Sequence, residues 1–164
     1  MRIPATARLL GALTALLLLA AAACSASESE VAASSGISFT LDDGSIATLQ
    51  DFEGAPVVLN FFASWCPPCR AELPDFEAVH QATGDDVTFL GINQDLDETT
   101  WRSFVAGTTI TYQTAFTGSE LFDSFGGIGM PTTVFLSADG EVLHTQTGAL
   151  SKDGLSALID EHFS

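Results

Sequence analysis

The sequence contains few basic residues, with five Lys and Arg against 21 Asp and Glu and a formal net charge of −16 at pH 7. Two of the five, Arg2 and Arg8, lie near the N-terminus, so the chain from residue 24 onward carries three basic and 21 acidic side chains, a net charge of −18. Such a surface repels phosphate backbones and anionic headgroups. The composition therefore excludes nucleic acid as a partner and argues against membrane binding by charge.

The sequence also lacks an internal repeat and a long hydrophobic run. The absence of a repeat excludes a solenoid or a propeller. The one uncharged apolar run, Leu9–Ala23, is shorter than the roughly 20 residues that a membrane span needs. It follows Arg2 and Arg8 and ends in small residues, a pattern typical of a signal peptide. We therefore predict a signal peptide at residues 1–23.

Cysteine is scarce, and the first of the three cysteines, Cys24, directly follows the small residues Ala21–Ala23 as in a bacterial lipoprotein box. If the other two cysteines pair, lipidation removes an odd thiol outside the cytoplasm. We expect lipidated Cys24 and a small, polar, flexible tether at 24–36, followed by one domain at 37–164. The alternative is ordinary cleavage near Ala26, which gives a soluble secreted protein.

The hydrophobic pattern after the tether predicts an α/β domain. Continuous apolar runs are typical of strands buried on both faces, and apolar residues at helical spacing indicate amphipathic helices. The expected elements, in order, are a hairpin at 37–49, a strand at 55–63, a helix at 66–84, a strand at 87–94, helices at 97–107 and 119–127, a hairpin of 131–137 with 141–148, and a final helix after Ser151. This order predicts a central mixed sheet flanked by helices on both faces, with an N-terminal hairpin extension.

Cys66 and Cys69 can form a metal clip, a structural staple or a redox pair. Structural zinc needs four ligands, and the three histidines occur singly on different predicted elements. A disulfide across such a short loop constrains the unfolded chain very little. A redox pair is therefore favoured, while Cu(I) binding by the two thiolates with Met130 stays open as an alternative.

The position of Cys66 favours thiol chemistry. It lies where the buried strand ends and a helix begins, and Pro67 and Pro68 suit a first helical turn that has no hydrogen bonds to lose. Free backbone N–H groups and the helix dipole favour a thiolate there. We predict that Cys66 is the exposed attacking thiol and that Cys69, nearly one turn further on, is the shielded resolving thiol.

Two segments resemble one family. The segment VVLNFFASWCPPCRAELPDFE (57–77) resembles the thioredoxin superfamily, and most closely its extracytoplasmic thiol–disulfide oxidoreductases of the TlpA and DsbE type. The segment GMPTTVFLSADGEVLHTQTG (129–148) resembles the second hallmark of that family, a proline loop followed by the closing hairpin. The resemblance covers about residues 37–164 and implies a thioredoxin-like fold.

The resemblance also implies roles for individual residues. Cys66 corresponds to the nucleophile and Cys69 to the resolving cysteine, with no metal and no cofactor beyond the redox-active disulfide. Met130 and Pro131 correspond to a cis-proline loop that faces the disulfide and pairs with the substrate backbone. The residues expected to contact substrate are Trp65, Pro67, Pro68, Met130, Pro131 and Thr132.

Three further positions bear on the chemistry. Asn60 stands where cytoplasmic thioredoxins have a buried Asp that accepts a proton. Glu72, on the same helical face as Cys69, is a candidate replacement for that proton acceptor. The alternative is that Glu72 is a solvent-exposed helix carboxylate, one of 21 acids. Phe62, where the family commonly has Trp, is expected to be a core residue.

By resemblance, the chain is expected to be an oxidoreductase anchored as a lipoprotein to the outer face of the cell membrane, on the periplasmic side. The favoured activity is reduction of protein disulfides, such as the haem-binding cysteines of apocytochrome c in cytochrome c maturation, with recharging by a membrane electron carrier. The alternatives are an oxidase that forms disulfides in secreted proteins and a Cu(I) metallochaperone. A thiol peroxidase would need Thr where this chain has Ala63.

Overall fold

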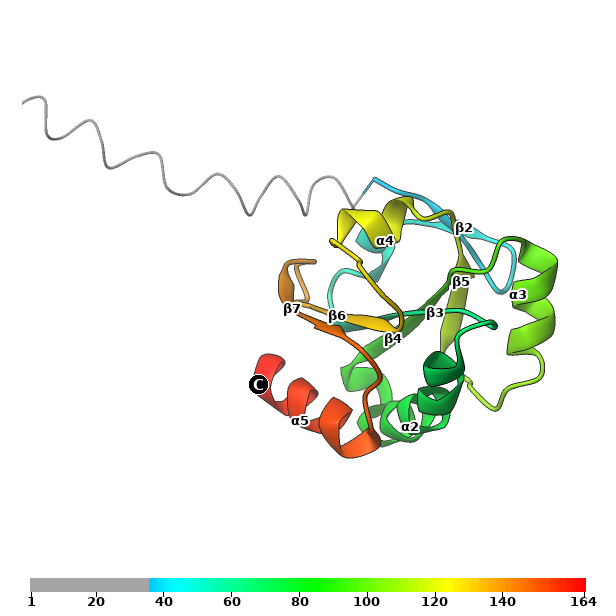
Figure 1. Cartoon of the computed structure of the whole chain (residues 1–164). Coiled ribbons are helices and arrows are strands. Elements are labelled where there is room, and N and C mark those ends of the chain that lie inside the picture. The colour runs from blue at the N-terminus through cyan, green and yellow to red at the C-terminus, as the bar shows by residue number, and fades with distance from the viewer. Residues whose placement is uncertain (1–35) are drawn as a thin grey trace, which may run out of the picture.

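The computed structural model describes residues 36–164, which form a seven-stranded mixed sheet with helices on both faces (Figure 1). The strand order across the sheet is β2-β1-β5-β4-β3-β6-β7. The strands are β1 (Phe39–Leu41), β2 (Ile46–Ala47), β3 (Val57–Phe62), β4 (Thr88–Asn93), β5 (Gln113–Phe116), β6 (Thr132–Leu136) and β7 (Val142–Thr147). The helices are η2 (Leu49–Phe52), α2 (Pro67–Thr83), η3 (Gly84–Asp86), α3 (Glu98–Val105), α4 (Glu120–Ser124) and α5 (Lys152–His162).

Most of the predicted elements are confirmed, including the N-terminal hairpin, in which Phe39 pairs with Ala47. Within residues 36–164, no helix is long and apolar enough to cross a membrane. The predictions of a signal peptide at 1–23, of a lipidated Cys24 and of nearly all of the tether fall outside the described residues.

The strand β5 is the one strand of the described residues that the sequence pattern did not predict. It lies between β4, with which it is parallel, and β1, with which it is antiparallel. Its four residues mix polar and apolar side chains, Gln-Thr-Ala-Phe, so they show neither a long apolar run nor a clear alternation. Pairing with both neighbours, rather than local sequence, makes this segment a strand.

The central strand β3 supports both layers of the core. All six of its residues are buried. Val57, Leu59 and Phe61 belong to one cluster, whereas Val58 and Phe62 face the other side. This arrangement explains the continuous apolar run, because both faces of the strand are covered.

Helices cover the two faces unequally, with α4 on one side of the sheet and α2 and α5 on the other (Figure 1). The helices α2 and α5 bury Phe76, Val79, Leu155 and Ile159 in a shared cluster. On the opposite face α4 buries Leu121. Thus α2, which begins at the cysteine pair, is held by packing along its length.

The topology brings distant loops to one edge of the sheet. Strands β3, β4 and β5 are parallel, so the loops that follow their carboxyl ends lie at the same edge. Strand β6 is antiparallel to β3, with Thr132 opposite Phe61, so the loop that precedes β6 reaches this edge too. Cys66, the segment after Asn93 and the loop before Thr132 therefore converge.

Candidate active site

The chain leaves β3 through a tight turn, Ala63–Cys66. The Cys66 N–H donates to the Ala63 carbonyl at 3.2 Å, which closes the turn. Trp65, inside the turn, is 62% exposed. The turn thus presents an aromatic side chain at the surface directly before the first cysteine.

Cys66 and Cys69 form a disulfide, with their Cα atoms 5.3 Å apart. Cys66 is also the N-cap of α2, and its Sγ accepts a hydrogen bond from the Cys69 N–H at 3.2 Å. Pro67 and Pro68 fill the first helical positions and remain exposed. A sulfur at this position receives both an N–H donor and the helix dipole, which favour the thiolate once the disulfide is reduced.

The prediction that Cys66 is exposed is wrong for this oxidised state. Cys66 is only 4% exposed and Cys69 is fully buried. Both belong to a buried cluster with Phe62 and Leu73. Met130 packs against this cluster. The order of accessibility nevertheless follows the expected one, with Cys69 more shielded than Cys66.

The loop before β6 lies against the cysteine pair. The Met130–Pro131 peptide bond is cis. The Thr132 hydroxyl donates to the Gly129 carbonyl at 2.7 Å, and the Gly148 N–H donates to the Pro131 carbonyl at 2.9 Å. These two bonds hold the backbone on either side of Met130.

Thr132 was predicted to contact substrate, and the structure gives its side chain a different position. The residue is fully buried, and its hydroxyl is used within the loop. Because it has no exposed surface, its side chain supports the loop rather than a bound partner. This corrects the sequence expectation for Thr132.

Glu72 is buried on α2, one turn after Cys69, with 2% of its surface exposed. Its Oε1 accepts a hydrogen bond from Asn60 Nδ2 at 3.0 Å, and its Oε2 accepts one from the Leu150 N–H at 3.0 Å. Burial raises the pKa of Glu72 to about 7, although these two hydrogen bonds act in the opposite direction. The alternative that Glu72 is a solvent-exposed carboxylate is therefore wrong.

Asn60 connects this carboxylate to the sheet. It is buried in β3, and its Nδ2 also donates to the Thr133 hydroxyl at 3.3 Å. Asn60 therefore does not accept a proton itself but holds Glu72 in place. Phe62, as expected, is a fully buried core residue.

A second buried carboxylate, Asp95, lies at the same edge, and the sequence analysis did not single it out. It is 6% exposed and follows β4 directly. It accepts hydrogen bonds from the backbone and hydroxyl of Ser64, in the turn before Cys66. A polar run after a buried parallel strand, Asn-Gln-Asp at 93–95, is the sequence signal that points to such a residue.

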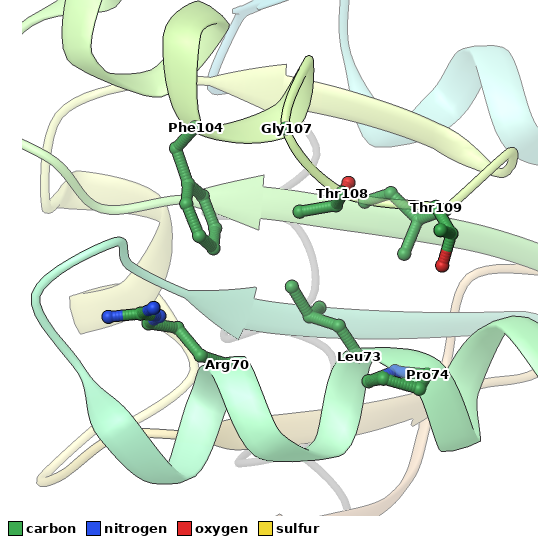
Figure 2. A pocket seen from close by; sticks show the side chains of 8 residues that line it. Arg70, Leu73, Pro74, Phe104, Gly107, Thr108 and Thr109 are labelled. Carbon is green, nitrogen blue, oxygen red and sulfur yellow. The ribbon is translucent and has the colours of Figure 1, made fainter.

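A groove adjoins the redox pair between α2 on one side and the end of α3 with the segment after it on the other (Figure 2). Its cavity of about 280 Å³ lies between Arg70, Leu73 and Pro74 on one side and Phe104, Thr108 and Thr109 on the other. Leu73 belongs to the cluster that contains both cysteines, and Phe104 packs against that cluster. The groove therefore shares a wall with the cysteine pair.

Three exposed apolar side chains belong to the converging loops. Trp65 follows β3, Leu96 follows β4 and Ile128 precedes β6. Leu96 is 98% exposed and Ile128 is 90% exposed. Apolar groups exposed together at one edge mark a surface suited to contacts with another protein.

The arrangement of the potential metal ligands bears on metal binding. Among residues 36–164, no group of three or more His, Cys, Asp or Glu side chains could hold a metal ion. The three histidines lie away from the cysteine pair: His80 contacts Phe89 and Tyr112, while His144 and His162 stack on each other with ring centroids 4.8 Å apart.

Comparison with known proteins identifies the family. The family model described as Redoxin matches residues 28–159. The chain belongs to the Redoxin family. This Redoxin is 28% identical to the thiol-disulfide oxidoreductase ResA of Halalkalibacterium halodurans, over 76% of this chain and 73% of ResA.

Solved structures show the same architecture. The Redoxin superposes on DsbF of Mycobacterium tuberculosis with a TM-score of 0.71 and 26% identity, covering 79% of this chain and 96% of DsbF. It superposes on an exposed lipoprotein thioredoxin of Streptococcus pneumoniae with a TM-score of 0.67 and 26% identity, covering 76% and 98%. The thioredoxin-like fold is therefore confirmed for this Redoxin.

Proposed function

We propose that this Redoxin is an extracytoplasmic protein thiol–disulfide oxidoreductase that works through Cys66 and Cys69 and reduces disulfides in partner proteins. The observation that carries the proposal is the disulfide at the N-terminus of α2, packed against the Met130–Pro131 loop. The redox-active disulfide itself is the only redox group required.

The first step begins with the reduced enzyme. The Cys66 thiolate attacks one sulfur of the partner disulfide, so a bond forms between Cys66 Sγ and that sulfur as the partner S–S bond breaks. The released partner sulfur leaves as a thiolate and takes up a proton. The N–H of Cys69 and the dipole of α2 stabilise the attacking thiolate.

In the second step Cys69 resolves the mixed disulfide. The Cys69 thiol loses its proton and attacks Cys66 Sγ, which releases the second partner thiol and forms the Cys66–Cys69 disulfide. Two electrons have then moved from the enzyme dithiol to the partner disulfide. Glu72, with a pKa of about 7, is suited to accept the Cys69 proton near neutral pH.

The surface around the redox pair supports a protein substrate. Trp65, Leu96 and Ile128 offer exposed apolar side chains on the loops at this edge, and the loop at Met130 and Pro131 lies against the cysteine pair, where its backbone can pair with a partner segment. Pro67 and Pro68 lie exposed beside Trp65. A partner segment with a disulfide next to apolar residues fits these contacts.

For the cellular role, we propose a lipoprotein on the outer face of the membrane, with a signal peptide at 1–23, lipidated Cys24 and a tether to residue 36. The likeness to an exposed lipoprotein thioredoxin supports this location. The resemblance to TlpA and DsbE proteins favours reduction of protein disulfides, including those of apocytochrome c, with electrons from a membrane carrier.

The reduction potential tests the direction of electron flow. We expect a value near about −270 mV, as for thioredoxin, and mostly reduced protein in cells. The potential follows from equilibrium with glutathione, and the cellular state from rapid acid quenching and alkylation. A potential approaching about −120 mV with mostly oxidised protein would instead establish an oxidase that forms disulfides.

Trapping tests the thiol chemistry itself. Cys69→Ala leaves Cys66 able to attack but removes the resolving thiol, so partner proteins should accumulate as mixed disulfides that reductant releases. The matched control is Cys66→Ala, which retains Cys69 and should trap nothing. If neither variant captures a partner and the wild-type protein does not reduce insulin, catalytic dithiol exchange is ruled out.

A further inference from the structure

We propose that Asp95 is a positioning residue for thiol–disulfide exchange, fixing the turn that carries Trp65 and Cys66. The inference rests on the proposed function, because it assigns a role in the same reaction. Asp95 lies outside the cysteine motif and acts on it through Ser64, the residue at the second position of the turn.

The hydrogen bonds to Asp95 hold Ser64 at two points. The Ser64 N–H lies 3.1 Å from Oδ1 and 3.3 Å from Oδ2, and the Ser64 hydroxyl donates to Oδ1 at 2.8 Å. Backbone and side chain of one residue are thus tied to one carboxylate. Such a pair of bonds fixes both the position and the orientation of the turn.

The carboxylate is itself held by β4. Asn93 Nδ2 donates to Asp95 Oδ2 at 3.0 Å, and the Asp95 N–H donates to Asn93 Oδ1 at 2.8 Å. Asn93 is fully buried at the last position of β4. The turn after β3 is therefore tied to the rigid end of the neighbouring strand.

The chemistry of this site requires a carboxylate. The two oxygens of Asp95 face only donors, from Ser64 and Asn93. An amide at this position could still accept the Ser64 bonds on its oxygen, but its NH₂ group would meet the Asn93 NH₂ group. Asparagine at position 95 should therefore still hold the Ser64 turn in part, whereas alanine should not hold it.

The turn controls two groups that act in the reaction. Ser64 immediately precedes Trp65, whose side chain is exposed, and Trp65 immediately precedes Cys66. Cys66 Sγ must keep its hydrogen bond from the Cys69 N–H while it attacks a partner sulfur. A displacement of about 1 Å in a reacting group can lower a rate by about a hundredfold.

The test compares Asp95→Ala, Asp95→Asn and Ser64→Ala with Asp97→Asn as the matched control. Asp97 is on the same loop and carries the same charge, but it is exposed and caps α3 through the Thr100 N–H at 2.9 Å. The rate constant for insulin reduction by each pre-reduced protein is measured at increasing pH until it reaches a plateau. The temperature is kept well below the melting temperature of every variant. The change in tryptophan fluorescence on reduction is recorded in parallel.

We expect Asp95→Ala to lower the plateau rate constant about tenfold or more and to diminish the fluorescence change on reduction. Asp95→Asn should recover part of the rate, Ser64→Ala should lose about two- to threefold, and Asp97→Asn should match the wild-type protein. A merely structural role would lower the melting temperature and leave the plateau rate unchanged.

A plateau rate in Asp95→Ala equal to that of Asp97→Asn would overturn the proposal. If Asp95→Ala does not fold, the outcome rests on Asp95→Asn and Ser64→Ala, and wild-type rates in both would overturn it equally. Failure of the wild-type protein to reduce insulin would instead count against the proposed function.

Discussion

Glu72 and Asp95 are both buried carboxylates next to the redox pair, but they are held by different surroundings. Glu72 accepts one hydrogen bond on each oxygen, from Asn60 and from the Leu150 N–H. Asp95 accepts bonds from two groups of Ser64 and from Asn93. Both lack a basic partner among residues 36–164, where the single salt bridge joins Arg102 to Glu98.

Burial and the number of hydrogen-bond donors separate the roles of the two carboxylates. For Glu72, burial outweighs two hydrogen bonds and raises the pKa to about 7, so the group can exchange a proton at neutral pH. Asp95 has more donors, and two of them belong to Ser64, in the turn that carries Cys66. We therefore assign proton transfer to Glu72 and positioning to Asp95.

The pH dependence of stability should reveal the buried Glu72 most strongly. Folding raises the pKa of Glu72 from 4.5 to about 7, so the native state holds this proton in a pH range where the unfolded state has lost it. Stability from this group is complete below pH 4.5 and is lost as pH rises through 7, about 3 kcal/mol in all. We expect Glu72→Gln to remove most of this loss between pH 5 and pH 8, measured by urea unfolding of the oxidised proteins.

Glu77→Gln is the matched control on the same helix. Burial alone would raise the pKa of Glu77, but hydrogen bonds from Thr111 and Gln81 outweigh it and hold the pKa below its usual range. Glu77 therefore stays ionised in both states from pH 5 to pH 8. Its variant should follow the wild-type pH dependence; if Glu72→Gln does so as well, Glu72 does not titrate near 7.

The second effect concerns the rate of resolution. Glu72→Gln keeps the size of the side chain but cannot accept the Cys69 proton, so resolution of a mixed disulfide at Cys66 should slow about a hundredfold above pH 7. The rate is measured as release of the second thionitrobenzoate after Cys66 reacts with Ellman's reagent. The wild-type rate should rise with pH through about 7, and Glu77→Gln should behave alike. A matching profile in Glu72→Gln would exclude Glu72 as the proton acceptor.

The smallest effect concerns the donor that holds Glu72. The hydrogen bond from Asn60 to Oε1 lowers the pKa of Glu72. Asn60→Leu removes this bond, so the pKa of Glu72 should rise and the midpoint of the stability profile should move to higher pH. Thr133→Val is the control, because it removes only the oxygen that accepts the second Asn60 bond. An unmoved midpoint in Asn60→Leu would mean that the Leu150 N–H alone counteracts burial.

The sequence predicted what depends on local pattern. The buried strand at 57–62 and the start of α2 after Cys66 each depend on consecutive residues. Both could therefore be predicted from the sequence. The helices predicted at 97–107 and after Ser151 also depend on adjacent residues, since Asp97 and Ser151 cap their first turns. The structure confirms these elements.

What the sequence could not predict depends on distant partners. Glu72 is buried by contacts with Asn60, 12 residues away, and Leu150, 78 residues away. The strand β5 exists because it lies between β1 and β4, and Asp95 bonds to Ser64, 31 residues earlier in the sequence. Spacing along one helix identified Glu72 as a candidate but could not tell a buried carboxylate from an exposed one.

The hydrogen bond from the Cys69 N–H to Cys66 Sγ makes the proposed nucleophile also the cap of α2. Through a thermodynamic cycle, the reduction potential of the pair measures the difference between the folding free energies of the dithiol and disulfide forms, relative to the same pair in the unfolded chain. Any substitution that strengthens the cap of the thiolate makes the enzyme a stronger oxidant and its reduced form harder to unfold. The difference in unfolding free energy between the two redox forms, measured by chemical denaturation, therefore reports the reduction potential of the pair.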